Sequence, residues 1–136
     1  MILASPEDTE RLAAKLLDAL PPGSLLLLEG VMGSGKTTLV SYLAAALGSS
    51  AAVSSPTYTL IHEYPSPQGT LVHIDAWRLE SAADLISTGL DDYLDHARLV
   101  VVEWGGDLLD HYPGATLVQL GFAEDGSRFA TMGRTP

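Results

Sequence analysis

Residues 30–37 read Gly-Val-Met-Gly-Ser-Gly-Lys-Thr and match the pattern G-x-x-x-x-G-K-S/T, which is typical of phosphate-binding loops. Glycines in such a loop let consecutive backbone N–H groups curl around an anion, and the start of the following helix adds about half a positive charge. Lys36 is then placed to reach the β- and γ-phosphates of a nucleoside triphosphate, and the Thr37 hydroxyl to ligate magnesium. The alternative is a glycine-rich strand-to-helix turn without a ligand. The candidate ligand-binding residues are Gly33, Ser34, Gly35, Lys36, Thr37 and Thr38.

Two predicted strands end in a carboxylate. Asp75 closes the strand predicted over 71–75, and Glu103 closes the one predicted over 99–103. An acid at the carboxyl tip of a strand beside a phosphate loop is the usual magnesium partner. Two such acids in one chain with a phosphate loop favour a functional pair. The pattern leaves open which of the two lies closer to the metal.

The segment 54–59 reads Ser-Ser-Pro-Thr-Tyr-Thr and follows Thr37 by about twenty residues. In several families of phosphate-loop proteins, a loop at this distance carries a Thr that senses the γ-phosphate and magnesium. Thr57 is therefore a candidate catalytic residue. A capped turn before a strand is the structural alternative.

Other polar and aromatic residues allow two interpretations each. His62 and His73 lack a third donor at metal-ligand spacing, so we expect ordinary hydrogen bonds within strands. Trp104, directly after Glu103, could pack in the core or line a nucleotide site or partner surface. Arg128 stands out because cations are scarce, and a surface ion pair is its plain alternative.

Helical and strand patterns alternate along the chain and would position these residues. Leu25–Glu29 and Leu99–Glu103 are short and continuously apolar, as expected of strands covered on both faces. Together the elements predict a single α/β domain over residues 1–136, with a mixed, mostly parallel sheet flanked by helices and β-hairpins. Helices are expected over 6–20, 36–47 and 82–88, with a further turn at 91–94. Strands are expected over 25–29, 58–64, 71–75, 99–103, 116–122 and 128–132.

Composition excludes several classes of protein. The 136 residues include 17 Asp and Glu against 7 Lys and Arg, which gives a net charge of −10. So few cations make a broad footprint on nucleic acid hard to build, so any role with nucleic acid is expected to be indirect. The absence of Cys excludes disulfides and thiolate chemistry. No apolar run approaches the roughly 18 residues of a membrane helix, and the acidic amino terminus lacks a signal-peptide pattern, so we expect a cytoplasmic protein without membrane contact.

The order of the motifs is more specific than the phosphate loop, which hundreds of families share. Ser-Pro-Thr is followed by His-x-Asp-x-aromatic-Arg-Leu and then by Glu-Trp. This set resembles the TsaE family, small bacterial ATPases of threonylcarbamoyladenosine synthesis in tRNA, and the match runs nearly end to end. The matching segments are 28–30, 33–38, 55–58, 62–64, 73–79, 89–94 and 102–104.

The resemblance implies a P-loop NTPase fold and a magnesium-dependent ATPase. It implies protein partners, TsaB and TsaD, which carry out the threonylcarbamoyl transfer, and contact with tRNA only through them. It further implies that Trp104 and Arg128 lie near the nucleotide. Val31 and Met32 depart from the family pattern, in which an acidic or amide residue is commonly followed by Leu. The backbone cradle does not depend on these side chains.

Roles for five candidate residues follow from the same resemblance. Lys36 and Thr37 would bind the triphosphate of ATP and Mg²⁺. Thr57 would belong to a switch-like loop. Glu103 would be the direct or near-direct magnesium partner, and Asp75 would support the metal or its water.

Three other functions compete with this interpretation. A small nucleotide or metabolite kinase would need an acceptor site and a lid rich in Arg, yet the arginines after the loop are dispersed. A non-catalytic nucleotide sensor would keep Lys36 and Thr37 but turn over little without a partner. A GTPase is disfavoured because no N-K-x-D signature follows and residues 75–78 lack the glycine of D-x-x-G. The dispersed arginines are Arg78, Arg98, Arg128 and Arg134.

Overall fold

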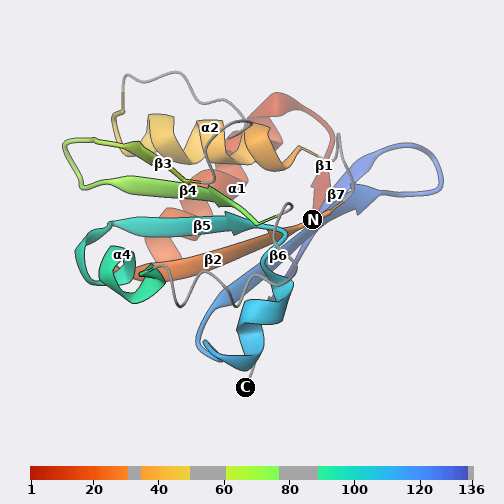
Figure 1. Cartoon of the computed structure of the whole chain (residues 1–136). Helices are drawn as coiled ribbons and strands as arrows, with labels where there is room; N and C mark the ends of the chain where they lie inside the picture. Colours follow the sequence, from red (N-terminus) through yellow and green to blue (C-terminus); the bar gives the residue numbers. More distant parts are fainter. Residues whose placement is uncertain (31–34, 50–60, 77–88, 135–136) are drawn as a thin grey trace.

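One seven-stranded sheet organises the protein (Figure 1). The computed structural model describes residues 1–30, 35–49, 61–76 and 89–134. The strands lie in the order β1-β7-β6-β2-β5-β4-β3. The elements in chain order are β1 (Ile2–Leu3), α1 (Pro6–Ala19), β2 (Ser24–Glu29), α2 (Lys36–Ala46), β3 (Ile61–Tyr64), β4 (Leu71–Asp75), α4 (Leu90–His96), β5 (Leu99–Glu103), the 3-10 helix η1 (Gly106–Asp110), β6 (Thr116–Phe122) and β7 (Arg128–Arg134).

The centre of the sheet is parallel and its flanks are antiparallel. Strands β4, β5, β2 and β6 pair in parallel. Strand β3 joins β4, β7 joins β6 and β1 joins β7 in antiparallel pairs. The carboxyl ends of the four parallel strands therefore meet at one edge of the sheet, the edge at which α/β proteins place their ligands.

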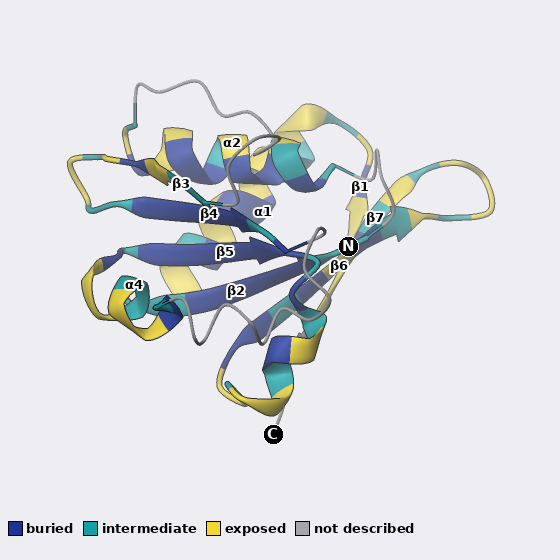
Figure 2. Cartoon of the chain, viewed as in Figure 1, coloured by how far each residue is buried: buried dark blue, intermediate teal, exposed yellow. Residues whose placement is uncertain are grey.

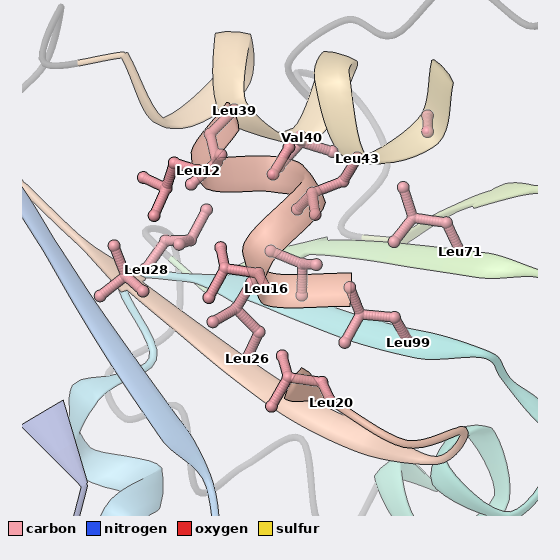
Figure 3. Packing of buried hydrophobic residues seen from close by; sticks show 14 of the residues in the cluster. Leu12, Leu16, Leu20, Leu26, Leu28, Leu39, Val40, Leu43, Leu71 and Leu99 are labelled. Atoms are coloured by element: carbon pink, nitrogen blue, oxygen red, sulfur yellow. The ribbon is translucent and has the colours of Figure 1, made fainter. Parts of the chain in front are cut away.

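Helices α1 and α2 pack on one face of the sheet (Figure 3). Successive strand residues point to opposite faces, so Leu26 and Leu28 meet these helices while Leu25 and Leu27 face the other way. The second face is covered in part by Leu90 of α4 and by other apolar side chains. Burial on both faces explains the continuously apolar central strands, which are dark blue in Figure 2. The labelled residues that α1, its C-cap and α2 contribute to this core are Leu12, Leu16, Leu20, Leu39, Val40 and Leu43.

The start of α1 shows why the chain becomes helical where it does. Ser5 is the N-cap with an extended backbone, Pro6 occupies the first helical turn, and Glu7 and Asp8 are acidic residues there. The Asp8 carboxylate accepts hydrogen bonds from the backbone N–H of Ala4 at 2.9 Å and of Ser5 at 3.2 Å. These contacts fix the turn between β1 and α1.

The predicted α/β class with a mixed sheet is confirmed, and seven predicted elements agree with the structure to within two residues at each end. The turn expected at 91–94 is part of the longer helix α4. Of the strand predicted over 58–64, only β3 is described, and the helix predicted over 82–88 lies outside the described residues. The agreeing elements are α1, β2, α2, β4, β5, β6 and β7.

Two elements were not predicted. Strand β1 has only two residues, too few to show an alternating pattern, and it forms because Ile2 pairs with Phe129 from the other end of the chain. Helix η1 begins at Gly106 directly after Gly105, and two adjacent glycines suggest a turn rather than a helix in the sequence. Among the described helices, none is long and apolar enough to cross a membrane.

Candidate functional site

Strand register brings the two predicted carboxylates together. Glu103 of β5 is the register partner of Asp75 in β4 and of Leu28 in β2. Cross-strand partners point to the same face, so both acids lie on the face that carries Leu28 and the helix α2. The end of β2, where the phosphate loop begins at Gly30, lies at the same edge.

The ends of β2, β4 and β5 form one corner of the molecule at this edge of the sheet. Lys36, the first residue of α2, lies in this corner. The preceding Gly35 has a left-handed backbone with φ of 105°, a conformation that glycine adopts without strain. The Lys36 side chain is buried, and its Nζ donates a hydrogen bond to the Gly30 carbonyl oxygen at 2.5 Å. Nζ also lies 4.3 Å from the centre of the Trp104 ring, in cation–π geometry. The ammonium is therefore held between the Gly30 carbonyl and the Trp104 ring, next to the first residue of the predicted phosphate loop.

Opposing electrostatic effects act on this ammonium. Burial lowers the pKa of Lys36, while the negative charges of Glu103, Glu29 and Asp75, in that order, raise it. The pKa is lowered overall, so the carboxylates do not fully compensate for the lost hydration. Further negative charge at this position, such as a phosphate, would stabilise the charged form.

Glu103 is the more enclosed of the two acids. It is 4% exposed, whereas Asp75 is half-buried. The Glu103 Oε2 atom makes a short contact with Nε2 of His73, which is fully buried on β4. The backbone around Glu103 is also fixed, because its carbonyl accepts from Ala76 N at 3.0 Å and the next residue, Trp104, donates to Leu28 O at 2.9 Å.

A tight turn after β5 aims Trp104 at Lys36. Trp104 has a φ of 63°, a left-handed conformation that costs a non-glycine residue roughly 1–2 kcal/mol. Gly105 follows, and a Cβ atom there would lie 2.6 Å from Cγ1 of Val102. The Glu29 carboxylate accepts a hydrogen bond from Gly106 N at 2.5 Å, which ties the turn to the end of β2. Strain of this kind is typical of functional sites.

A cavity of about 410 Å³ lies beside the start of α2. It falls in the size range of small-molecule sites. Thr38 lines it from the first turn of α2, and the exposed Arg128 lines it from β7, with its guanidinium carbon 5.8 Å from the Phe122 ring centre. The lining residues with polar side chains are Ser5, Thr9, Thr38, Ser127 and Arg128.

The structure thus brings several predicted site residues to one corner. Lys36, Glu103, Asp75 and Trp104 surround the end of β2, and Thr37 is half-buried in the first turn of α2. The predicted residues Gly33, Ser34 and Thr57 lie outside the described part of the chain.

Sequence reasoning missed two residues of this corner. Glu29 directly precedes the first glycine of the loop, and its acidic side chain at a strand end was the available signal. The hydrogen bond expected for His73 is present, but its partner Glu103 was not predicted; the available signal was that His73 stands two residues before Asp75 and so shares its face. The ordinary hydrogen bond expected for His62 is present, 3.1 Å from Nδ1 to the Tyr64 hydroxyl.

The donor set fits magnesium rather than a metal held by the protein alone. Within the described residues, no group of three His, Asp or Glu side chains could hold an ion. Magnesium is usually bound by one or two carboxylates together with substrate phosphates and water. The Thr37 hydroxyl and the Glu103 carboxylate, with Asp75 beside it, match that chemistry.

Comparison with known proteins decides the family. The family model for "Threonylcarbamoyl adenosine biosynthesis protein TsaE" matches residues 3–130. The chain belongs to the TsaE family. TsaE from a Nostoc species is 36% identical over 135 residues, which cover 96% of this chain and 82% of the relative. TsaE from Treponema pallidum is 33% identical over 129 residues, covering 94% and 95%.

A solved structure agrees with this assignment. The crystal structure of Bacillus subtilis YdiB superposes with a TM-score of 0.73 at 28% identity, covering 97% of this chain and 82% of that one. The resemblance of the motif order to TsaE is therefore confirmed, and so is the fold class that it implied.

Proposed function

We propose that this TsaE-family protein is a magnesium-dependent ATPase that supports threonylcarbamoyl modification of adenosine in tRNA by acting on the TsaB–TsaD complex. The observation that carries the proposal is the buried Lys36 ammonium next to the first residue of the predicted phosphate loop, with Glu103 and Asp75 close by. A bound triphosphate would place negative charge next to this buried ammonium and so stabilise its charged form. The two carboxylates would be the acidic partners of the metal.

In this proposal the nucleotide lies across the start of α2. Lys36 would bind the β- and γ-phosphates, and the sequence pattern of Gly33, Ser34 and Gly35 predicts that their backbone N–H groups bind phosphate as well. The cavity beside Thr38 and Arg128 has the size and polar groups to receive the base and ribose. Trp104 packs against the Lys36 ammonium and limits its movement.

Thr37 and Glu103 would hold Mg²⁺, with Asp75 supporting the ion or its water. When bound, the ion would neutralise charge on the β- and γ-phosphates. Glu103 keeps a fixed backbone and a buried carboxylate for this task, and Thr57 would sense the γ-phosphate. The protein's part is therefore to position charge rather than to form a covalent intermediate.

The scarcity of cations supports the proposal that ATP hydrolysis depends on a partner protein. A cation that stabilises the transition state can contribute about 10³–10⁵ in rate. Arg98, one of the arginines that follow the loop, donates to Leu17 O at 3.0 Å next to the amino end of β5, the edge of the sheet opposite the site. The similar proteins from Nostoc and Treponema pallidum are named for tRNA threonylcarbamoyladenosine biosynthesis, which supports TsaB–TsaD as the partner.

The test is ATP turnover by the protein alone and with TsaB–TsaD, with Lys36→Ala as the inactive control. We expect slow release of phosphate alone and a clear increase with the complex. Transfer of labelled phosphate to an acceptor molecule would instead indicate a kinase. ATP binding without turnover in either condition would indicate a nucleotide sensor and contradict the ATPase.

A further inference from the structure

The function proposed so far uses Glu103 but gives no role to His73, the buried residue that contacts it. His73 is fully buried and Glu103 is 4% exposed. His73 pairs in register with Val101, and two residues later Asp75 pairs with Glu103, so the His73 imidazole reaches the Glu103 carboxylate diagonally across β4 and β5. Two adjacent strands in the centre of the sheet therefore fix the distance between the two side chains.

The direction of the hydrogen bond follows from the surroundings of the imidazole. Within the described part of the chain, Nδ1 of His73 has no hydrogen-bond partner. With a proton on Nε2, the ring donates to the Glu103 carboxylate, which accepts. With the proton on Nδ1, the ring would bury an unpaired N–H and turn a lone pair towards the carboxylate. The Nε2–H form is therefore the one that the site favours.

The imidazole itself has little freedom. The Tyr64 ring lies 6.5 Å from it between centroids, tilted by 33°, and is buried as well. The backbone on both sides of Glu103 is held by hydrogen bonds to β2 and to the residue after β4. The side-chain torsions of Glu103 are then the freedom that remains, and the contact with His73 restrains them through Oε2.

We propose that His73 is a positioning residue that orients the Glu103 carboxylate towards the magnesium and phosphate site. The inference rests on the proposed ATPase function and names a residue through which Glu103 acts. His73 uses one carboxylate oxygen, Oε2, and leaves the other to serve the ion. Partners that orient a metal-binding carboxylate typically change metal affinity or activity by about 10–100-fold when they are removed.

The experiment compares three substitutions at His73. In His73→Gln the amide nitrogen can occupy the position of Nε2 and donate. In His73→Asn the amide nitrogen is one bond too short, and His73→Phe has no donor at all. His62→Phe is the matched control, because His62 is the register partner of His73 on β3 and hydrogen-bonds to Tyr64 rather than to Glu103.

The first readout is binding of a non-hydrolysable ATP analogue by calorimetry, with Mg²⁺ and with EDTA. We expect His73→Phe to keep the affinity measured in EDTA within about threefold, while the gain in affinity from Mg²⁺ falls about tenfold. The second readout is turnover, in which kcat falls by about 10–100-fold and KM changes little. His73→Gln restores both, and His62→Phe behaves like the wild type.

Each outcome distinguishes a positioning role of His73 from a purely structural one. A wild-type magnesium effect in His73→Phe, or equal defects in the Phe and Gln variants, would show that His73 only fills space. If the Phe variant does not fold, the comparison of Asn with Gln takes its place, and equal behaviour of these two overturns the inference. A wild-type protein whose affinity does not depend on Mg²⁺ overturns the proposed function and this inference with it. A magnesium effect in the wild type with unaffected His73 variants overturns this inference alone.

Discussion

The chemistry of the site depends on a few charged side chains whose surroundings differ. The Lys36 ammonium is buried, hydrogen-bonded to Gly30 O and in contact with an aromatic ring. Its pKa is lowered mainly by burial. Burial thus disfavours the charged form of Lys36, and in the proposed function a bound triphosphate would supply the opposite charge.

Lys36→Ala is expected to weaken ATP binding by about tenfold or more, because charge-assisted hydrogen bonds contribute about 1.5–3 kcal/mol each. The fold should survive, since the substitution removes a buried charge and leaves the apolar core intact. Calorimetry with ATP measures the affinity, and thermal unfolding measures the stability. Unchanged ATP affinity would refute the assignment of Lys36 to the triphosphate.

Glu103→Gln should reduce turnover by about 100-fold or more, because the amide keeps the size of the carboxylate but removes the charge that faces the metal. ATP binding should fall much less. Asp75→Asn is the comparison, since Asp75 is the register partner and is more exposed. A far larger loss of turnover in Asp75→Asn than in Glu103→Gln would reverse the two roles.

At the scale of elements, the turn between β5 and η1 sets the position of Trp104. Its left-handed backbone is maintained by the hydrogen bond from Trp104 N to Leu28 O and by the bond from Gly106 N to Glu29. Gly105 packs between these two contacts with no room for a side chain. The site therefore depends on close packing behind it.

Gly105→Ala should destabilise the protein by about 1–3 kcal/mol, the usual cost of overpacking a core. Its Cβ would lie 2.6 Å from Cγ1 of Val102 and 3.2 Å from Cδ2 of Leu27. Gly114→Ala is the control, because no atom lies within 4 Å of the added Cβ. Urea unfolding measures both, and equal stability of the two variants would contradict the packing argument.

At the scale of the whole molecule, charge limits what the protein can bind directly. The chain has seven cations against 17 carboxylates, and one of these cations, Lys36, is buried and hydrogen-bonded to Gly30 O. Arg98 lies next to the amino end of β5 and Arg128 lies across from Phe122 at the carboxyl end of β6, so these two arginines are at opposite edges of the sheet. They cannot form one basic patch.

The protein alone should therefore bind tRNA weakly at about 0.1–0.15 M salt, because few counterions are released. Nucleotide-dependent association with TsaB–TsaD should be much tighter. Filter binding with labelled tRNA and calorimetry with the complex compare the two. Submicromolar binding to tRNA alone with a steep salt dependence would contradict an indirect role.

Local patterns were enough to predict much of this protein. The helix that begins at Lys36 and the strands that end in Asp75 and Glu103 are properties of short segments, because glycine spacing and apolar runs act on neighbouring residues. The motif order was enough to predict the TsaE family, which the comparisons confirm.

Tertiary structure was needed wherever distant segments meet. The register of β4 on β5 places His73 against Glu103, and nothing in either strand alone specifies that pairing. The two-residue β1 exists only because β7 lies beside it. The strand order likewise determines that Arg98 and Arg128 lie at opposite edges of the sheet, which their positions in the sequence do not show. Such contacts join residues far apart in sequence, and burial then sets the electrostatics of Lys36, because the loss of hydration depends on everything packed around it.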